Sequence, residues 1–283
     1  MSITSKGKKA CVILDNNQVV TKILVLQEVW ELEGDMLLKF AVDVKKGTTI
    51  FYNNDSFLAP DDYKAGDYLY FSKGTFHPTT FRFAIGSSTF CDYYSEIYML
   101  KDFDFSKVSS MWIFTFDMPL LTKLDVSHLD TSNINNMNSS FRGLGVKKLN
   151  LSNFDTSKVT NMFAMFYSCR SLTSLDVSNF DLGVCTRIDS MFNNCTSLTN
   201  LIFGSKWGTQ TSTAANALTL DLSTIGSEKS CKLTDETYNS MLTMYDRASN
   251  GLTTMTIKFS TKHNLPDGFA EKMSALGYTI TLV

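Results

Sequence analysis

A repeat of about 26 residues in the middle of the chain constrains the fold more than any other feature. The stretch that starts at Leu149 reads LNLSNFDTSKVTNMFAMFYSCRSLTS, and the stretch that starts at Leu175 reads LDVSNFDLGVCTRIDSMFNNCTSLTN. The two align without a gap, so that Cys169 meets Cys195. A third copy begins at Leu124, and more degraded copies lie on either side. Because one unit cannot bury its own apolar residues, we expect the copies to stack into a solenoid with a shared core.

Each unit predicts a short strand, a turn and a short helix. Residues 172–177 alternate apolar and polar side chains, which is the period-two pattern of a strand. The segment 155–157 then offers carboxylate and hydroxyl oxygens that suit a helix N-cap. Apolar residues follow at the spacing i, i+3, i+6 and i+7 of one helix face: Val159, Met162, Met165 and Phe166. We therefore expect the Met and Phe residues of the repeat to form its core.

The repeat also resembles a known family. Residues 149–172 match the pattern L-D-V-S-N-F-D-T-S-x-V-x-x-M-x-x-M-F-x-x-C-x-S-L almost position by position, and this pattern resembles the BspA-like leucine-rich-repeat family of bacterial surface proteins. The resemblance covers roughly residues 98–205 and implies a leucine-rich-repeat fold. It further implies adhesion to host proteins and to other cells, or a place in bacteriophage tail and fibre proteins. It brings no catalytic residues.

The flanking segments differ from the repeats and complete the expected fold. Before residue 95, turn signals separate strand candidates, and these indicate an antiparallel sandwich: a hairpin at 11–20, then 23–30, 36–44, 48–52, 67–71 and 80–85. The tail predicts a helix, a strand, a second helix and a final strand. The expected fold is an α/β leucine-rich-repeat solenoid over 96–207, preceded by an all-β, sandwich-like domain over 1–95. A polar loop and a small α+β cap are expected over 208–283.

Side chains that alternate with the core leucines form the candidate binding surface, because solenoids commonly use the exposed face of their sheet for recognition. We predict two columns: Lys123, Lys148, Ser174 and Asn200 in one, and Asp125, Asn150, Asp176 and Ile202 in the next. A solvated face with no ligand is the alternative. A purely structural role is a second alternative for the Asp and Asn ladder.

The sequence offers no catalytic motif. No cysteine forms a C-x-x-C pair or lies at metal-ligand spacing from His77, His128 or His263, so we expect buried free thiols. Cys169 and Cys195 should lie about one strand spacing, roughly 4.8 Å, apart, which a disulfide tolerates, yet we expect them to be reduced. No nucleophile–base motif or phosphate-binding glycine loop is present. We therefore predict no enzymatic activity, with no catalytic residue, no cofactor and no metal.

Charge and hydropathy exclude two classes of partner. The formal net charge of −2 provides no basic field for nucleic acid. No apolar run reaches the roughly 18 residues of a membrane helix. The apolar segment 11–14 is too short for a signal-peptide core, so we expect no standard secretion leader.

Three functions remain in view at this stage. The leading hypothesis is a virion component of a bacteriophage, assembled in the bacterial cytoplasm. Its N-terminal domain would attach to other virion or surface proteins, and its repeats would bind a host protein or glycan; homo-oligomerisation is left open. The second hypothesis is a bacterial cell-surface adhesin. The third is a glycan-processing enzyme, whose paired carboxylates would meet only in the fold.

Overall fold

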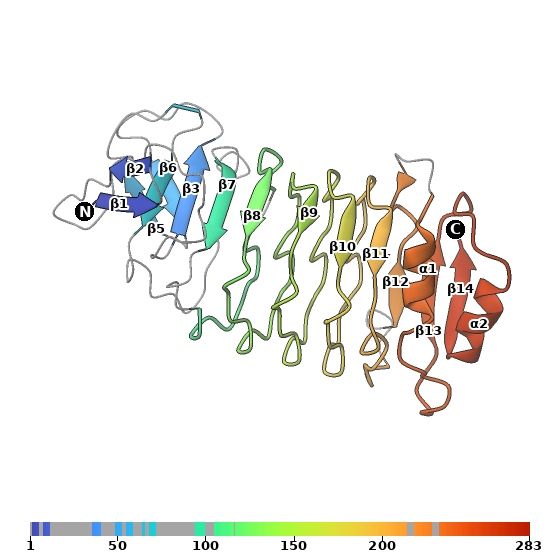
Figure 1. Cartoon of the computed structure of the whole chain (residues 1–283). Helices are drawn as coiled ribbons and strands as arrows, with labels where there is room; N and C mark the ends of the chain where they lie inside the picture. The colour runs from blue at the N-terminus through green and yellow to red at the C-terminus, as the bar shows by residue number, and fades with distance from the viewer. Residues whose placement is uncertain are drawn as a thin grey trace.

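The protein is an elongated, predominantly β structure in which parallel coils stack side by side (Figure 1). The computed structural model describes residues 2–5, 8–11, 36–40, 49–52, 55–58, 64–65, 68–71, 94–99, 105–115, 117–213, 218–227 and 232–283. The N-terminal strands lie at one end of the stack, and the helices and last strands lie at the other (Figure 1).

The described N-terminal strands all pair antiparallel with one another. The pairs are β1 (Ser2–Ser5) with β2 (Lys8–Cys11), β4 (Thr49–Tyr52) with β5 (Asp55–Leu58), and β3 (Met36–Phe40) with both β6 (Tyr68–Phe71) and β7 (Tyr94–Met99). The strands expected at 36–44, 48–52 and 67–71 are confirmed in shorter form, whereas β1, β2, β5 and β7 were not predicted, and β2 meets the expected hairpin only at Cys11. Most of the hairpin expected at 11–20, and the strands expected at 23–30 and 80–85, lie outside the described residues. The sandwich-like domain therefore stays a prediction.

Strand β7 joins the N-terminal sheet to the solenoid. It pairs antiparallel with β3 and parallel with β8 (Lys123–Asp125), with Ile97 opposite Leu124. The backbone N–H of Thr122 also donates to the carbonyl of Ser95, at 2.8 Å. Backbone hydrogen bonds therefore cross the boundary expected at residues 95 and 96 without interruption.

The repeats form a parallel sheet in register, as their alternating pattern predicts. Strands β9 (Lys148–Leu149), β10 (Ser174–Asp176) and β11 (Asn200–Ile202) each place one central leucine opposite the next. These leucines are buried, and their neighbours along the strand are exposed or half-buried. The solenoid and its period-two strands are thus confirmed.

The helix expected within each repeat is wrong. Between residues 105 and 213, apart from residue 116, the described backbone forms turns and strands but no helix. In the segment 162–166, alternate backbone N–H groups donate to the next coil. The N–H of Met162 donates to the carbonyl of Arg187, and that of Phe166 donates to the carbonyl of Met191. The N–H of Met165 instead closes a turn onto the carbonyl of Met162. Turns closed by hydrogen bonds between residues three apart, at 156–159, 162–165 and 166–169, therefore produce the apolar spacing that resembles a helix face.

Left-handed backbone at two fixed points of each coil makes these turns possible. One column of residues has φ between 51° and 58°: Ile113, Ser139, Ala164 and Ser190. A second column, four residues further on, has φ between 49° and 70°: Asp117, Gly143, Ser168 and Asn194. An α-helix cannot pass through positive φ, so these positions explain why the repeat is a β-solenoid and not the expected α/β coil.

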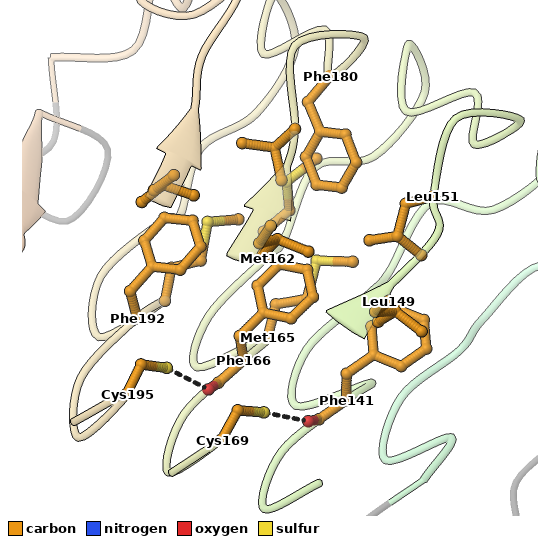
Figure 2. Packing of buried hydrophobic residues seen from close by; sticks show 14 of the residues in the cluster. Phe141, Leu149, Leu151, Met162, Met165, Phe166, Cys169, Phe180, Phe192 and Cys195 are labelled. Atoms are coloured by element: carbon orange, nitrogen blue, oxygen red, sulfur yellow. Dashed lines mark hydrogen bonds between the residues drawn. The ribbon is translucent and has the colours of Figure 1, made fainter. Parts of the chain in front are cut away.

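Aromatic rings stack along the core axis, one per coil. The rings of Phe141 and Phe166 are 5.7 Å apart and nearly parallel, and those of Phe166 and Phe192 are 5.6 Å apart (Figure 2). Cys169 and Cys195 lie beside this stack as buried, free thiols. Each thiol donates to a carbonyl of the preceding coil, at 2.9 and 3.0 Å respectively (Figure 2). The predicted stripe of Met162, Met165 and Phe166 is therefore core, whereas Phe163 is half-buried and lies outside it.

Buried threonines join the coils at a second point. The hydroxyl of Thr156, which is 1% exposed, donates to the carbonyl of Asp181 at 3.1 Å and accepts from the N–H of the same residue at 2.7 Å. Thr131 repeats this arrangement with Asp155 one coil earlier. One threonine side chain thus pairs with both the N–H and the carbonyl of a residue in the next coil. No β-strand runs through this point of the coil, so strand pairing does not satisfy these two groups.

The C-terminal region carries a second three-stranded parallel sheet and both α-helices of the described chain. Strands β12 (Thr219–Asp221), β13 (Met255–Phe259) and β14 (Tyr278–Leu282) form a parallel sheet in that order. Helix α1 (Asp235–Met241) precedes β13, and α2 (Phe269–Ala275) precedes β14. The elements occur in the order expected of the tail, while its role as a cap stays a prediction.

Candidate functional site

The first predicted column lies along the exposed face of the solenoid sheet. Lys148, Ser174 and Asn200 occupy equivalent register positions on β9, β10 and β11. Lys123 holds the corresponding position on β8, opposite Glu96 of β7. The parallel register therefore places Lys148, Ser174 and Asn200 in one row, whereas β8 pairs with β7 in a separate sheet. Lys123 and Lys148 are exposed, and Ser174 is half-buried.

Contacts of individual members limit which part of this row is accessible. The ammonium of Lys123 lies 4.6 Å from the centroid of the Tyr98 ring, a cation–π distance. The amide of Asn200 donates to the carboxylate of Glu236 and accepts from the hydroxyl of Thr234, both at 2.9 Å. Asn200 therefore belongs to the contact between β11 and the start of α1. The accessible row runs through Lys123, Lys148 and Ser174.

The second predicted column has a structural use in the turns that follow the strands. Asp125, Asn150 and Asp176 each accept a hydrogen bond from the backbone N–H of the serine two residues later, at 2.9 to 3.1 Å. These are Asx turns, in which the side chain replaces a backbone acceptor. Ile202, the fourth member, is half-buried on β11. Of the two alternatives left open for this ladder, the hydrogen bonds support the structural one.

A shallow hollow of about 130 Å³ nevertheless lies between two of these turns. It is lined by Asn150 and Ser152 of one coil and by Asp176, Ser178 and Asn179 of the next. Leu149 and Leu151 also line the hollow, so the candidate surface combines two lysines and a serine with a small depression of mixed polar and apolar lining.

The opposite side of the coils holds arginine–aromatic pairs that the sequence analysis missed. The guanidinium of Arg187 lies 4.2 Å from the centroid of the Phe163 ring, and that of Arg142 lies 4.9 Å from the Tyr167 ring. Trp112, on the same side, is 49% exposed. These pairs were missed because a helix was assigned to this segment, and a helix does not alternate buried and exposed side chains. If buried and exposed residues are instead assumed to alternate from Met162 onward, Phe163 becomes exposed. Alignment with the next copy then places Phe163 close to Arg187.

The three cysteines of the repeats and His263 are buried, whereas His128 is exposed. Burial raises the pKa of the Cys185 thiol to about 11 and that of the Cys195 thiol well above its ordinary value. His263 is 5% exposed, and burial lowers its pKa. Among the described residues, no group of three or more His, Cys, Asp or Glu side chains is arranged to hold a metal ion. No described helix is long and apolar enough to cross a membrane.

Together these features define a parallel β-solenoid built from a repeat of 25 or 26 residues, with a polar exposed sheet. A family model described as "Mycoplasma protein of unknown function, DUF285" matches residues 108–228, which is less than half of the chain. The match begins in the first coils and ends beyond β12, so it spans the repeats. This match and the solenoid are consistent with a BspA-like repeat protein. The strand–helix coil of a leucine-rich repeat is not what the structure shows. Neither a curated protein nor a solved structure matches the chain.

Proposed function

We propose that the chain is a non-enzymatic binding and structural protein that presents its solenoid sheet to a partner. The observation that carries this proposal is the exposed sheet, on which Lys148 and Ser174 lie on strands of fixed register and Lys123 holds the equivalent position of the preceding coil. Because β9, β10 and β11 hold one another in register, the spacing of Lys148 and Ser174 is set before a partner arrives, and a preformed surface binds at a lower entropic cost. The partner is a host surface protein or a glycan.

The absence of activity is part of the proposal and has its own support. Cys185 and Cys195 are buried thiols whose pKa is raised by burial, and a neutral thiol is a poor nucleophile. A screen for hydrolysis of oligosaccharides by the purified chain tests this part. Turnover above that of a heat-denatured control would restore the glycan-processing hypothesis.

A matched pair of charge reversals tests the surface. Labelled protein is incubated with cells of the candidate host, and the bound fraction is measured. We expect Lys123→Glu/Lys148→Glu to reduce binding at least tenfold, because both changes lie in the proposed contact. Lys158→Glu is the control: Lys158 is exposed at another corner of the coil, where its ammonium donates to Asn133. Equal binding by all three proteins would contradict the proposal for this face.

The assembly in which the protein serves is proposed to be a bacteriophage virion, with the bacterial cell surface as the alternative location. The resemblance of the repeats to those of phage tail and fibre proteins supports the first location, and their resemblance to surface adhesins supports the second. Mass spectrometry of purified particles and of washed cell envelopes from the source separates the two. Light scattering after size exclusion adds the oligomeric state. A concentration-independent trimer or larger ring favours a fibre, and a monomer favours a stand-alone binding surface.

A further inference from the structure

A pocket of about 650 Å³ lies outside the repeats, at the C-terminal end of the molecule. One wall is the chain that enters α1, and the other is the loop between β13 and α2. Five exposed polar residues line it: Lys232, Asp235, Lys262, Asn264 and Asp267. Pockets that bind small molecules are usually about 300–1,000 Å³, so a ligand of that class has room here.

Tyr238 of α1 also lines this pocket, and its hydroxyl has no hydrogen-bond partner in the described part of the chain. The residue is only 3% exposed. Its ring is held between those of Phe259 and Phe269, at centroid distances of 6.3 and 5.2 Å. Burial, followed by the nearby carboxylate of Asp235, raises the pKa of Tyr238 to about 12. The phenol is therefore protonated at neutral pH, and its hydroxyl is a buried, unsatisfied hydrogen-bond donor of a residue that lines the pocket.

The charges around the pocket cancel. Two lysines, Lys232 and Lys262, line the pocket together with two aspartates, Asp235 and Asp267, and none of the four belongs to an ion pair of the described residues. An anion would meet the carboxylates and a cation would meet the ammonium groups, and like-charge contacts oppose binding. A neutral ligand that carries both donors and acceptors avoids this repulsion. The side chains of Leu265 and Pro266 add apolar surface beside the polar groups.

Both walls of the pocket are held by contacts to the rest of the structure. In the β13–α2 loop, the buried ring of His263 lies 3.1 Å from the carbonyl of Ile225 and accepts from the N–H of Ser260. Before α1, the N–H of Thr234 donates to the carbonyl of Thr199, at 2.9 Å. The pocket is therefore formed before a ligand arrives, which lowers the entropic cost of binding.

We propose that this pocket binds a neutral, hydroxyl-rich ligand, namely a sugar residue of a glycan. Sugar hydroxyls both donate and accept, which matches the lysines, aspartates and Asn264, and an oxygen of the ring or of a hydroxyl accepts from Tyr238. The apolar face of the sugar packs on Leu265 and Pro266. This inference goes beyond the proposed function, because the site lies outside the solenoid sheet and can be present or absent whatever that sheet binds.

Nuclear magnetic resonance of the intact, ¹⁵N-labelled chain tests the proposal. The protein is titrated separately with glucose, galactose and N-acetylglucosamine, and in parallel with inorganic phosphate and glycine as charged probes. We expect at least one neutral sugar to cause saturable shifts of amides in the segments 232–238 and 262–267. Shifts in these segments with phosphate or glycine alone, or with none of the probes, would overturn it.

The variant Tyr238→Phe isolates the buried hydroxyl. It keeps the ring between its aromatic neighbours, so we expect it to fold and to bind the sugar about five- to tenfold more weakly, as the loss of one hydrogen bond implies. Tyr167→Phe, in the repeats, is the control: it removes a hydroxyl that accepts from Asn194 and should leave sugar affinity unchanged. Parent affinity in Tyr238→Phe, with a normal spectrum, would show that the hydroxyl does not take part and would overturn the assignment.

Discussion

Replacement of Thr156 by valine separates hydrogen bonding from packing as the force that joins the coils. The two side chains have the same shape, and Thr156 is fully buried. Packing alone predicts that the extra methyl group stabilises the protein by about 0.8 kcal/mol. The hydroxyl, however, serves both the N–H and the carbonyl of Asp181. An unsatisfied buried donor costs about 1–3 kcal/mol, and the half-buried position of Asp181 places the cost in the lower part of that range. Loss of the hydrogen bond to the Asp181 carbonyl costs a further amount of about 0.5–1 kcal/mol. After the gain from the methyl group is subtracted, we expect Thr156→Val to lower the free energy of unfolding by about 1–2 kcal/mol.

Urea unfolding, followed by the fluorescence of the tryptophans, measures this difference. The comparison is valid if the slope of the free energy of unfolding against urea is the same in parent and variant. Thr160→Val is the matched control, because the Thr160 hydroxyl donates to the carbonyl of Asn135 at an exposed site where water can replace it. We expect its effect to stay below about 0.5 kcal/mol. A Thr156→Val protein as stable as the parent, or more stable, would refute the argument that hydroxyls join the coils.

Three further predictions concern the core, the backbone and pH. Phe166→Ala removes the middle ring of the stack and should lower the free energy of unfolding by about 3–5 kcal/mol in the same urea assay; a loss below about 1 kcal/mol would contradict tight packing at this ring. Gly143→Ala should cost about 2–4 kcal/mol, because φ is +70° and a Cβ would lie 2.8 Å from the Cα of Asp117; an unchanged urea midpoint would count against the strained turn. Burial lowers the pKa of His263 below its ordinary 6.5, so the unfolded chain takes up its proton first. Stability contributed by the neutral ring is then complete above pH 6.5 and declines as the pH falls from 6.5 through the lower folded pKa. His263→Asn should flatten this part of the pH profile, and parallel profiles for both proteins would exclude the histidine as its source.

The strands of the solenoid were predictable from sequence because their signal is local. Leu149, Leu175 and Leu201 alternate with polar residues, and gapless alignment of the copies places them opposite one another. The same alignment gave the row of Lys148 and Ser174. It could not give the loss of Asn200 from that row, because its partner Glu236 lies 36 residues later, outside the repeat.

The helix was mispredicted because apolar spacing does not report the backbone angles. Val159, Met162, Met165 and Phe166 fit a helix face and fit a series of three-residue turns equally well. The feature that distinguishes the two is positive φ at Ala164 and at equivalent residues such as Ile113. Glycine in a sequence indicates that positive φ is possible, whereas alanine and isoleucine do not. The pocket beside Tyr238 was likewise beyond the sequence, because its walls come from two segments that only the fold brings together.

The equivalence of the coils makes the length of the protein adjustable. Interior coils present equivalent carbonyls and an equivalent aromatic ring to the next coil, and each ends one strand spacing further along the axis. Removal of one repeat, from Leu149 to Ser174, would bring the ring of Phe141 onto that of Phe192 and leave both ends of the molecule unaltered. The number of coils therefore sets the distance between the N-terminal sheet and the C-terminal pocket, and each added or removed coil changes this distance by about 4.8 Å. Gain or loss of one repeat in the gene would move whatever is bound at one end relative to the other by one such step.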